Sequence, residues 1–315
     1  MVAGVFFFIA PDCLLRQCQA LRDREAEMSA NAKGALLMMA SMAAFVINDT
    51  FLKLTNGAIP LFQLIFVRGV LATILIYFLA RSLGALRSGI GPRDKGLIAL
   101  RGVAEIVTSY FFLSALFKMP LGNLNAIMQV VPLTVTLGSA LFYREAVGWR
   151  RMLAIAVGFC GVLLIIRPGA EGFNIWSLYA LGAVICVTLR DLLTRQLSAD
   201  VSGMAVTLGT TVSVMIAAGL ASLTQEWVPV TGQQSVYIVG SAVFILAGYF
   251  FSIQVMRAGD VSFIAPFRYT GLIGAMIIGY FVFDEVPTAL TLLGAAIVTG
   301  MGLFTFYRER KLSRA

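Results

Sequence analysis

Two acid–base pairs with the same spacing are the first candidates for chemistry in this chain. Asp49 and Lys53 are four positions apart, and Asp191 and Arg195 repeat that spacing in the second half of the sequence. Residues at this spacing share one face of a helix, so each acid can pair with its base. The pattern predicts gating or coupling positions at Asp49 and Asp191. An alternative stays open, in which the pairs lie at an interface and the basic side chains reach water.

Two polar residues beside prolines are the strongest candidates for binding a ligand. Arg268 closely follows Pro266, and Gln129, at the equivalent place in the first half of the chain, closely precedes Pro132. Proline interrupts the helical hydrogen-bond ladder and frees backbone carbonyls near these side chains. Arg268 offers a fork of donors for a carboxylate, a phosphate or a carbonyl-rich ring. The alternative for Arg268 is a structural pair with a carboxylate such as Glu105.

Three further charged residues lie inside apolar segments. Glu105 follows Arg101 at the spacing of one helical turn, so the two can neutralise each other. If Glu105 is instead free in a cavity, it is the best candidate for a proton-coupling carboxylate. Arg68 is expected to hold helices together, and a coupling or gating role for it stays open. Aromatic and amide side chains complete the candidate site, namely Tyr110, Tyr249, Tyr269, Asn48, Asn125 and Gln254.

The composition requires a membrane to position these residues. Hydrophobic residues make up 59% of the 315 residues and charged residues 13%, and the mean hydropathy is +0.88. Soluble domains have about a quarter charged residues. Basic residues lie in short connections, which fits orientation signals and argues against nucleic acid as a partner. No histidine is present and the four cysteines form no CxxC pair, so neither a metal site nor a cofactor is expected.

Ten stretches are long enough to cross a bilayer core, which takes about 20 apolar residues. They begin near Gly34, Pro60, Gly96, Leu121, Arg151, Ile175, Met204, Ser235, Val261 and Pro287. If the N-terminus is cytoplasmic, eighteen of the 24 lysines and arginines are on the inner side, three on the outer side and three within spans. Because basic residues are enriched in cytoplasmic loops, both termini are predicted to be cytoplasmic.

Internal echoes indicate a duplication. Tyr110-Phe111-Phe112 matches Tyr249-Phe250-Phe251, Lys118 matches Arg257 at the same offset along the sequence, and Glu145 matches Glu285 at nearly the same one. Five spans per copy is an odd number, so the second copy enters the membrane in the opposite direction. The expected fold is an all-α polytopic membrane protein with ten transmembrane helices in two inverted five-helix repeats.

The sequence resembles the drug/metabolite transporter superfamily, specifically its EamA type. Arg68 on the second span, Tyr143-Arg144-Glu145 and Phe283-Asp284-Glu285 at the ends of the fourth and ninth, and glycine-rich fifth and tenth spans carry the resemblance. It implies repeats over residues 33–168 and 174–307, and a basic cytoplasmic tail over 308–315. It also implies a central cavity lined by eight spans. The fifth and tenth spans would pack to one side through small residues or support a homodimer.

Residues 1–32 are expected to form an N-terminal tail. The segment 1–27 within it is read either as a mis-called start, with Met28 as the alternative, or as a disordered cytoplasmic segment. The apolar stretch in it is followed, not preceded, by arginines, which is unlike a cleavable signal.

The favoured function is a secondary transporter of the inner membrane that moves a small polar or amphipathic metabolite by alternating access. No GxxxxGK[ST] motif is present, so ATP is not expected to drive it. Among the cargoes of the resembled family, riboflavin uptake is the leading prediction. S-adenosylmethionine, amino acids or other metabolites, imported or exported, are the alternatives. A membrane-embedded enzyme is the alternative from another class, but the clustered carboxylates and longer loops that it would need are not visible.

Overall fold

A computed structural model describes the backbone of residues 11–86, 90–144, 148–167, 174–198, 200–255 and 261–313, with side chains between residues 30 and 308 except 261 and 262. Every regular element in this described part of the chain is a helix. Ten helical spans there are long and apolar enough to cross a membrane. The predicted all-α membrane fold with ten spans is therefore confirmed.

The first five spans contain six helices, because one span is broken. They are α1 (Pro11–Leu54), α2 (Leu61–Ser82), α3 (Pro92–Leu116), α4 (Leu121–Met128) with α5 (Val131–Tyr143), and α6 (Trp149–Ile166). The membrane span of α1 covers Ala30–Leu54. The helix itself begins at Pro11, inside the segment expected to be a tail.

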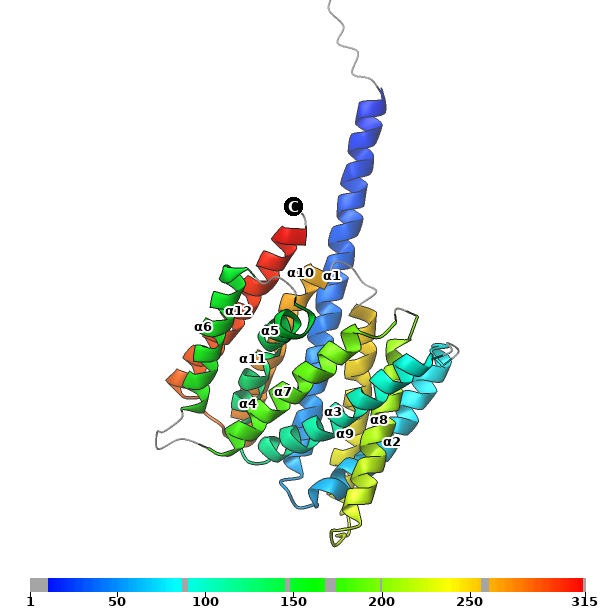
Figure 1. Ribbon diagram of the computed structural model, residues 1–315, viewed down its shortest axis with the longest axis vertical. Helices are drawn as coiled ribbons and strands as arrows, with labels where there is room; N and C mark the ends of the chain where they lie inside the picture. Colours follow the sequence, from blue (N-terminus) through cyan, green and yellow to red (C-terminus); the bar gives the residue numbers. More distant parts are fainter. Residues whose placement is uncertain are drawn as a thin grey trace, which may run out of the picture.

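The second five spans have the same arrangement, with the break again in the fourth. They are α7 (Trp176–Arg195), α8 (Gly203–Ser222), α9 (Gly232–Val255), then α10 (Val261–Ile264), the 3-10 helix η1 (Ala265–Tyr269) and α11 (Thr270–Phe283) in one span, and α12 (Ala289–Ser313). Figure 1 shows the N-terminal part of α1 projecting from the bundle on the same side as the end of α12. This side is called the terminal face below, and the other side the far face.

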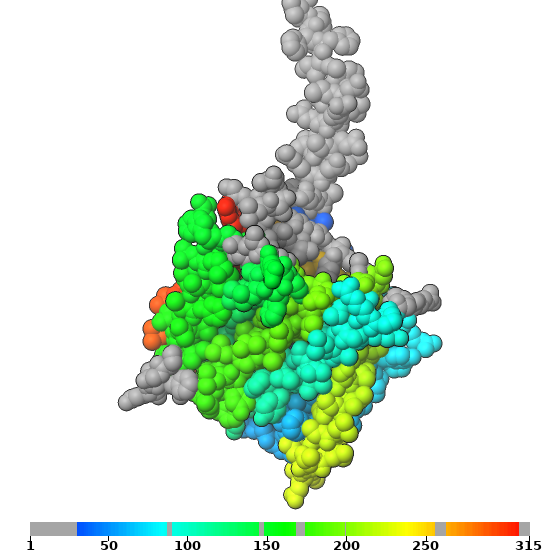
Figure 2. All heavy atoms as spheres, viewed as in Figure 1, coloured from blue at the N-terminus to red at the C-terminus, as the bar shows by residue number. Residues whose placement is uncertain are grey.

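Eight of the spans form a ring in which neighbours come from different repeats. Each of α1, α2, α3 and the α4–α5 span packs mainly between two spans of the second repeat. The order around the ring is α1, α9, α2, α8, α3, α7, α4–α5, α10–α11, and back to α1. Figure 2 shows one outer side of this ring, where α7, α3 and α8 lie next to one another. An inverted pair of repeats accounts for this alternation, because each contact has a counterpart with the repeats exchanged.

The remaining two spans, α6 and α12, pack against each other beside the ring. Their backbones meet at Gly161 and Gly294, where a Cβ on Gly294 would lie 2.5 Å from the carbonyl oxygen of Gly161. No side chain fits at that distance, so glycine is required for the close approach. The expectation that the fifth and tenth spans lie to one side and pack through small residues is therefore confirmed.

Equivalent helix ends in the two repeats have the same backbone conformation. Arg144 ends α5 at φ 54°, and Asp284 ends α11 at φ 53°, both in the left-handed region. The two positions are separated by the same offset as Glu145 and Glu285, which directly follow them. Few non-glycine residues adopt this conformation, so its recurrence supports the duplication independently of the sequence. Glu145 and Arg257 themselves lie outside the described residues.

Candidate functional site

The two broken spans place polar side chains at matching points of the ring. Helix α4 ends at Met128 and α5 begins at Val131, with Pro132 in its first turn. In the second repeat Pro266 lies in the first turn of η1, which separates α10 from α11. The backbone passes the first break through short-range bonds, such as Val130 N–H to the carbonyl of Ile127 at 3.1 Å. These are the breaks that the two prolines predict.

Arg268 and Gln129 lie at these breaks with unused hydrogen-bonding capacity. Within the described chain, neither side chain forms a hydrogen bond or ion pair with another residue. Gln129 is buried and Arg268 is partly exposed, although both are in the middle of spans. Arg268 interacts electrostatically with Asp191 on α7. A guanidinium at this depth normally has a partner, so a group from outside the chain can take that place.

A first polar cluster joins α1, α2 and α9, and Asn48 is its centre. The Asn48 Oδ1 accepts hydrogen bonds from Arg68 Nη2 at 2.9 Å and from Ser241 Oγ at 2.8 Å. The Asn48 amide donates to Asp49 Oδ1 at 2.9 Å. Arg68 therefore connects α2 to α1, as the sequence indicates. Its Nε is buried and has no hydrogen-bond partner among the described residues. We call these four residues the amide cluster.

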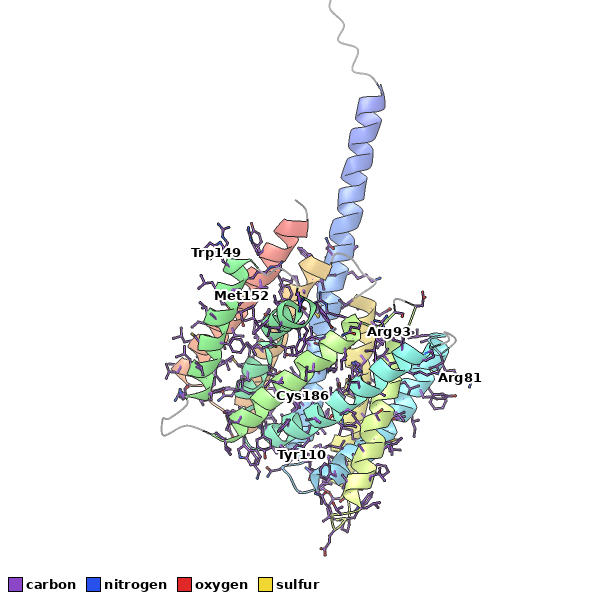
Figure 3. The ribbon with its side chains drawn as sticks, viewed as in Figure 1. Arg81, Arg93, Tyr110, Trp149, Met152 and Cys186 are labelled. Atoms are coloured by element: carbon purple, nitrogen blue, oxygen red, sulfur yellow. The ribbon has the colours of Figure 1, made fainter. Side chains whose placement is uncertain are left out.

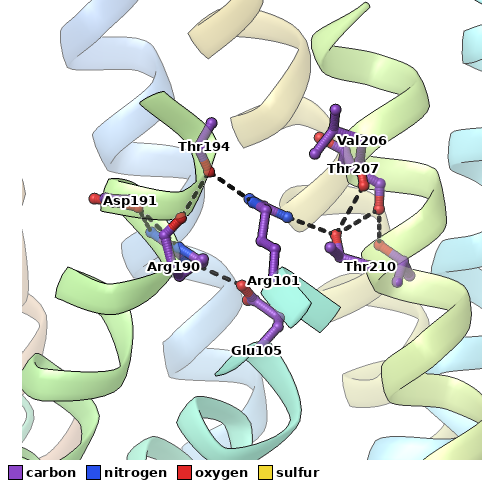
Figure 4. A network of polar contacts seen from close by, with 9 residues as sticks. Arg101, Glu105, Arg190, Asp191, Thr194, Val206, Thr207 and Thr210 are labelled. Carbon is purple, nitrogen blue, oxygen red and sulfur yellow. Dashed lines mark hydrogen bonds and ion pairs between the residues drawn. The ribbon is translucent and has the colours of Figure 1, made fainter. Parts of the chain in front are cut away.

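A second polar cluster joins α3, α7 and α8, and Arg190 is its centre (Figure 4). Arg190 forms ion pairs with Glu105 at 3.3 Å and with Asp191 at 2.8 Å. Arg101 donates from Nε to Thr194 Oγ1 at 2.9 Å and from Nη1 to Thr210 Oγ1 at 2.8 Å. We call these six residues the charge cluster. Because it links two ring neighbours to α3, it fixes the packing of all three helices.

Tyr249 is the residue that interacts with both clusters. The phenol of Tyr249 on α9 interacts electrostatically with Arg68 of the amide cluster and with Glu105, Arg190 and Arg101 of the charge cluster. Its ring packs edge-on against Phe45 of α1, with centroids 5.6 Å apart. Tyr249 therefore lies between the clusters, where a molecule held in the ring would meet it.

The same-helix pairs expected from the four-residue spacing are wrong. Two of the ion pairs, Lys53–Glu285 and Glu105–Arg190, join different helices, while Asp191 pairs with its neighbour Arg190 on α7. Lys53 pairs with Glu285 instead of Asp49, and Asp191 pairs with Arg190 instead of Arg195, which donates to Ser139 Oγ. Glu105 likewise pairs with Arg190 and not with Arg101 or Arg268. Pairing across helices satisfies a buried charge and joins two elements at once, which a pair within one helix cannot do.

Lys53 is the centre of a contact at the far face. Its Nζ lies 2.5 Å from Glu285 Oε1 and donates to the carbonyl of Met119 at 2.6 Å. The backbone N–H of Leu121 donates to Glu285 Oε2 at 2.7 Å. These bonds tie the end of α1 to the start of α4 and the end of α11. The side chains of Lys53 and Glu285 are only 12% and 18% exposed, so Lys53 does not simply extend into water.

Within the described chain, the other candidates form no hydrogen bond or ion pair with either cluster. Tyr269 is buried with its hydroxyl against Gly302 of α12, so it faces a span outside the ring. Figure 3 shows Tyr110 toward the far end of α3, where its side chain is 39% exposed and stacks on Phe62. Asn125 donates to the carbonyl of Leu121 in its own helix. Gln254 lies half-buried in the last turn of α9.

Sequence reasoning overlooked Arg190 and the neutral partners of the clusters. The charge of Arg190 fits the basic residues of the predicted inner side, yet Arg190 lies within the span of α7. Its position next to Asp191 and one helical turn before Thr194 was the available signal. Ser241 and Thr210 carry no such signal, because serine and threonine are common in membrane helices. No group of three acidic or cysteine side chains that could hold a metal ion exists in the described part of the chain.

Comparison with known proteins identifies the family. A family model described as EamA-like transporter family matches residues 32–167 and, a second time, residues 174–307. The chain belongs to this family. As an EamA-like protein it is a multi-pass transporter that lies in the lipid bilayer of the inner membrane and moves small metabolites across it. The double match confirms that the ten spans are two copies of one unit.

Several curated proteins are similar over nearly the whole EamA-like region. A riboflavin transporter of Vibrio cholerae is 28% identical over 90% of this chain and 95% of its own length. An S-adenosylmethionine uptake transporter of Rickettsia conorii is 25% identical over 88% and 92%. A pseudopaline exporter of Pseudomonas aeruginosa is 25% identical over 84% and 93%.

A solved crystal structure has the same fold. It superposes with a TM-score of 0.61 at 17% identity and covers 89% of this chain and 99% of the other.

Proposed function

We propose that this chain is a secondary transporter that takes up riboflavin by alternating access around a central site. The observation that carries the proposal is the pair of polar side chains, Arg268 and Gln129, that lack partners at the two helix breaks of the described chain. Both can donate to oxygen acceptors of riboflavin, such as the hydroxyls of its ribityl chain. Transporters build their sites in this way, from broken helices at the repeat interface. Family membership supports a chain that moves its cargo unchanged and is not an enzyme.

The charge balance of the interior favours riboflavin over S-adenosylmethionine. The two clusters and Arg268 together hold four arginines, against the three carboxylates of Asp49, Glu105 and Asp191. Glu105 and Asp191 are already paired with Arg190, and Asp49 accepts from Asn48. In these clusters a sulfonium cation would find only the Asp49 carboxylate outside an ion pair, next to an excess of arginines. A neutral ring rich in acceptors would find free donors.

The contact between Lys53 and Glu285 can close the far side of the transporter during alternating access. Lys53 and Glu285 join α1 of the first repeat to α11 of the second, and these spans must separate for the far side to open. The excess of lysine and arginine at the other side supports cytoplasmic termini, so the far face is the outer one. In this arrangement Lys53 and Glu285 hold the outer side closed. Asp49, Asp191, Glu105 and Arg68 stay candidates for coupling or gating.

Riboflavin uptake by a riboflavin-auxotrophic bacterium that lacks its own transporter tests the proposal. We expect the wild type to restore growth on low riboflavin and to accumulate labelled vitamin. Arg268→Ala should lower uptake about ten-fold or more, because a hydrogen bond to a charged group contributes about 1.5–3 kcal/mol. Arg268→Lys should recover part of it, since a lysine keeps the charge but loses the fork. Full uptake by Arg268→Ala would rule out the central site.

A second measurement addresses the energy source. A protonophore added during uptake should collapse accumulation if the proton gradient drives it. Accumulation that persists would point to another ion, and equilibration without accumulation to facilitated diffusion.

A further inference from the structure

A pocket of about 320 Å³ lies between α2, α3 and α8, in the half of the bundle nearer the far face. Its walls are apolar apart from Ser109 and Tyr110. Neither Arg268 nor Gln129 lines it, so it is distinct from the helix breaks. The volume is at the lower end of the range for small-molecule sites, about 300–1,000 Å³, and such sites are mostly apolar with a few polar groups.

The helices that line the pocket contribute side chains of different shape. The rings of Phe62 and Tyr110 are stacked, with centroids 6.0 Å apart and planes only 18° from parallel. Helix α8 contributes the small residues Ala217, Ala218 and Ala221. A pocket that combines two near-parallel aromatic rings with small side chains leaves space suited to a planar ring. Stacking or edge contacts with aromatic side chains contribute beyond simple burial.

The pocket continues toward the two polar clusters along the helices that line it. Ile65 lies just under one helical turn before Arg68, and Val214 lies about one turn after Thr210, so each pair shares a helix face. The apolar space therefore ends about one helical turn from Arg68. The Arg68 Nε is buried there without a hydrogen-bond partner in the described chain. A buried donor without a partner costs free energy, which a ligand acceptor would recover.

We propose that this pocket is the subsite for an uncharged, planar fused-ring system on the cargo, and that Arg68 donates to the acceptor-rich edge of that ring. The inference rests on the proposed function for the identity of the cargo. A lipid acyl chain is the competing occupant. It has no acceptor at its methyl end, so it would leave the Arg68 donor unused.

Inhibition of riboflavin uptake by lumichrome tests the subsite, because lumichrome has the fused ring without the ribityl chain. We expect lumichrome to compete in the wild type. Ala218→Phe fills the pocket and should weaken both riboflavin uptake and lumichrome inhibition about ten-fold, equivalent to about 1.4 kcal/mol. Ile216→Phe is the matched control, since Ile216 is on the same helix but 53% exposed. It should behave as the wild type.

A second variant keeps the test decisive if Ala218→Phe does not fold. Phe62→Ala removes one of the two stacked rings and should weaken lumichrome inhibition. It adds no bulk between the helices, so it does not push them apart as a larger side chain would. Unchanged inhibition in both variants would overturn the subsite. If the wild type takes up no riboflavin, the proposed function fails by itself. Quenching of lumichrome fluorescence by purified wild type, compared with Phe62→Ala, then still decides whether the pocket binds a fused ring.

Discussion

The amide cluster and the charge cluster occupy corresponding places in the two repeats but use different chemistry. Asn48 corresponds to Arg190, Asp49 to Asp191 and Arg68 to Thr210, all at one constant offset along the sequence. In each cluster the aspartate accepts from the residue immediately before it. The central residue is a neutral amide in one cluster and a guanidinium with two carboxylate partners in the other.

This difference shows how a duplicated scaffold can divide two tasks. In the charge cluster Arg190 is neutralised by Glu105 and Asp191, and its pair with Glu105 holds α3 and α7 together. Arg101 also ties α3 to both α7 and α8. The amide cluster leaves Arg68 Nε without a partner in the described chain and lies one turn from the apolar pocket. We therefore expect substitutions in the charge cluster to affect stability first, and those in the amide cluster to affect transport first.

The largest effect should follow from Arg190→Ala. It leaves the carboxylates of Glu105 and Asp191 without their cation. Because these side chains are partly buried, the loss should approach the roughly 3 kcal/mol that breaking a fully buried ion pair costs. Thermal unfolding of the detergent-purified protein should show a clear loss of stability. Arg81→Ala, at an exposed arginine, serves as control. Equal stability of the two variants would mean that the charge cluster does not hold the fold.

Asn48→Ala should have the next largest effect, and it should affect riboflavin uptake more than stability. It removes the acceptor of Arg68 and Ser241 and the donor to Asp49. We expect riboflavin uptake to fall about ten-fold, because the hydrogen bonds involved contribute about 1–2 kcal/mol. Stability should fall less than in Arg190→Ala. Asn125→Ala is the matched control, since that amide bonds within its own helix. A stability loss larger than that of Arg190→Ala would reverse the division of tasks.

The two aspartates allow a direct comparison at one scaffold position. Asp191 contacts two nitrogens of Arg190, whereas Asp49 accepts from one neutral amide. Asp191→Asn should therefore destabilise the protein by roughly 1 kcal/mol more than Asp49→Asn, as charge-assisted bonds are about twice as strong as neutral ones. Unfolding temperatures of the two variants, measured side by side, give the answer. Identical values would show that the clusters are energetically equivalent.

The smallest effect should come from Thr210→Val. It removes one of the two threonine acceptors of Arg101 and keeps the shape of the side chain, so Thr194 still holds the guanidinium. We expect a loss of about 1 kcal/mol and nearly normal uptake. Combining it with Thr194→Val should cost more than the sum of the single changes, because Arg101 then loses both acceptors. A strictly additive pair would argue against a shared network.

The sequence was sufficient for the architecture, because span length, apolar composition and repeat offset act over long stretches. The prolines also located both breaks, at Pro132 and Pro266, since the loss of an N–H is a local property. The partners of the charges were not accessible in the same way. Spacing shows which residues share a helix face, but Lys53–Glu285 and Glu105–Arg190 join different helices, and their meeting depends on the ring order.

Tyrosine positions illustrate the same limit. Tyr110 and Tyr249 match between the repeats, yet one is exposed at the far end of α3 and the other lies between the clusters. Tyr269 follows Arg268 directly, but both lie in the 3-10 helix η1, in which adjacent residues point about 120° apart. The Tyr269 side chain turns to Gly302 of α12, whereas Arg268 interacts electrostatically with Asp191 of α7.

The alternating order of the ring has a consequence for biogenesis. Since the main neighbours of every ring helix belong to the other repeat, the first five spans have no interior of their own after insertion. Asn48, Arg101 and Glu105 then lack their partners Ser241, Thr210 and Arg190, which are synthesised only with the second repeat. The second repeat thus acts as an assembly partner of the first. The polar residues of the two repeats pair only when the full ten-span bundle assembles.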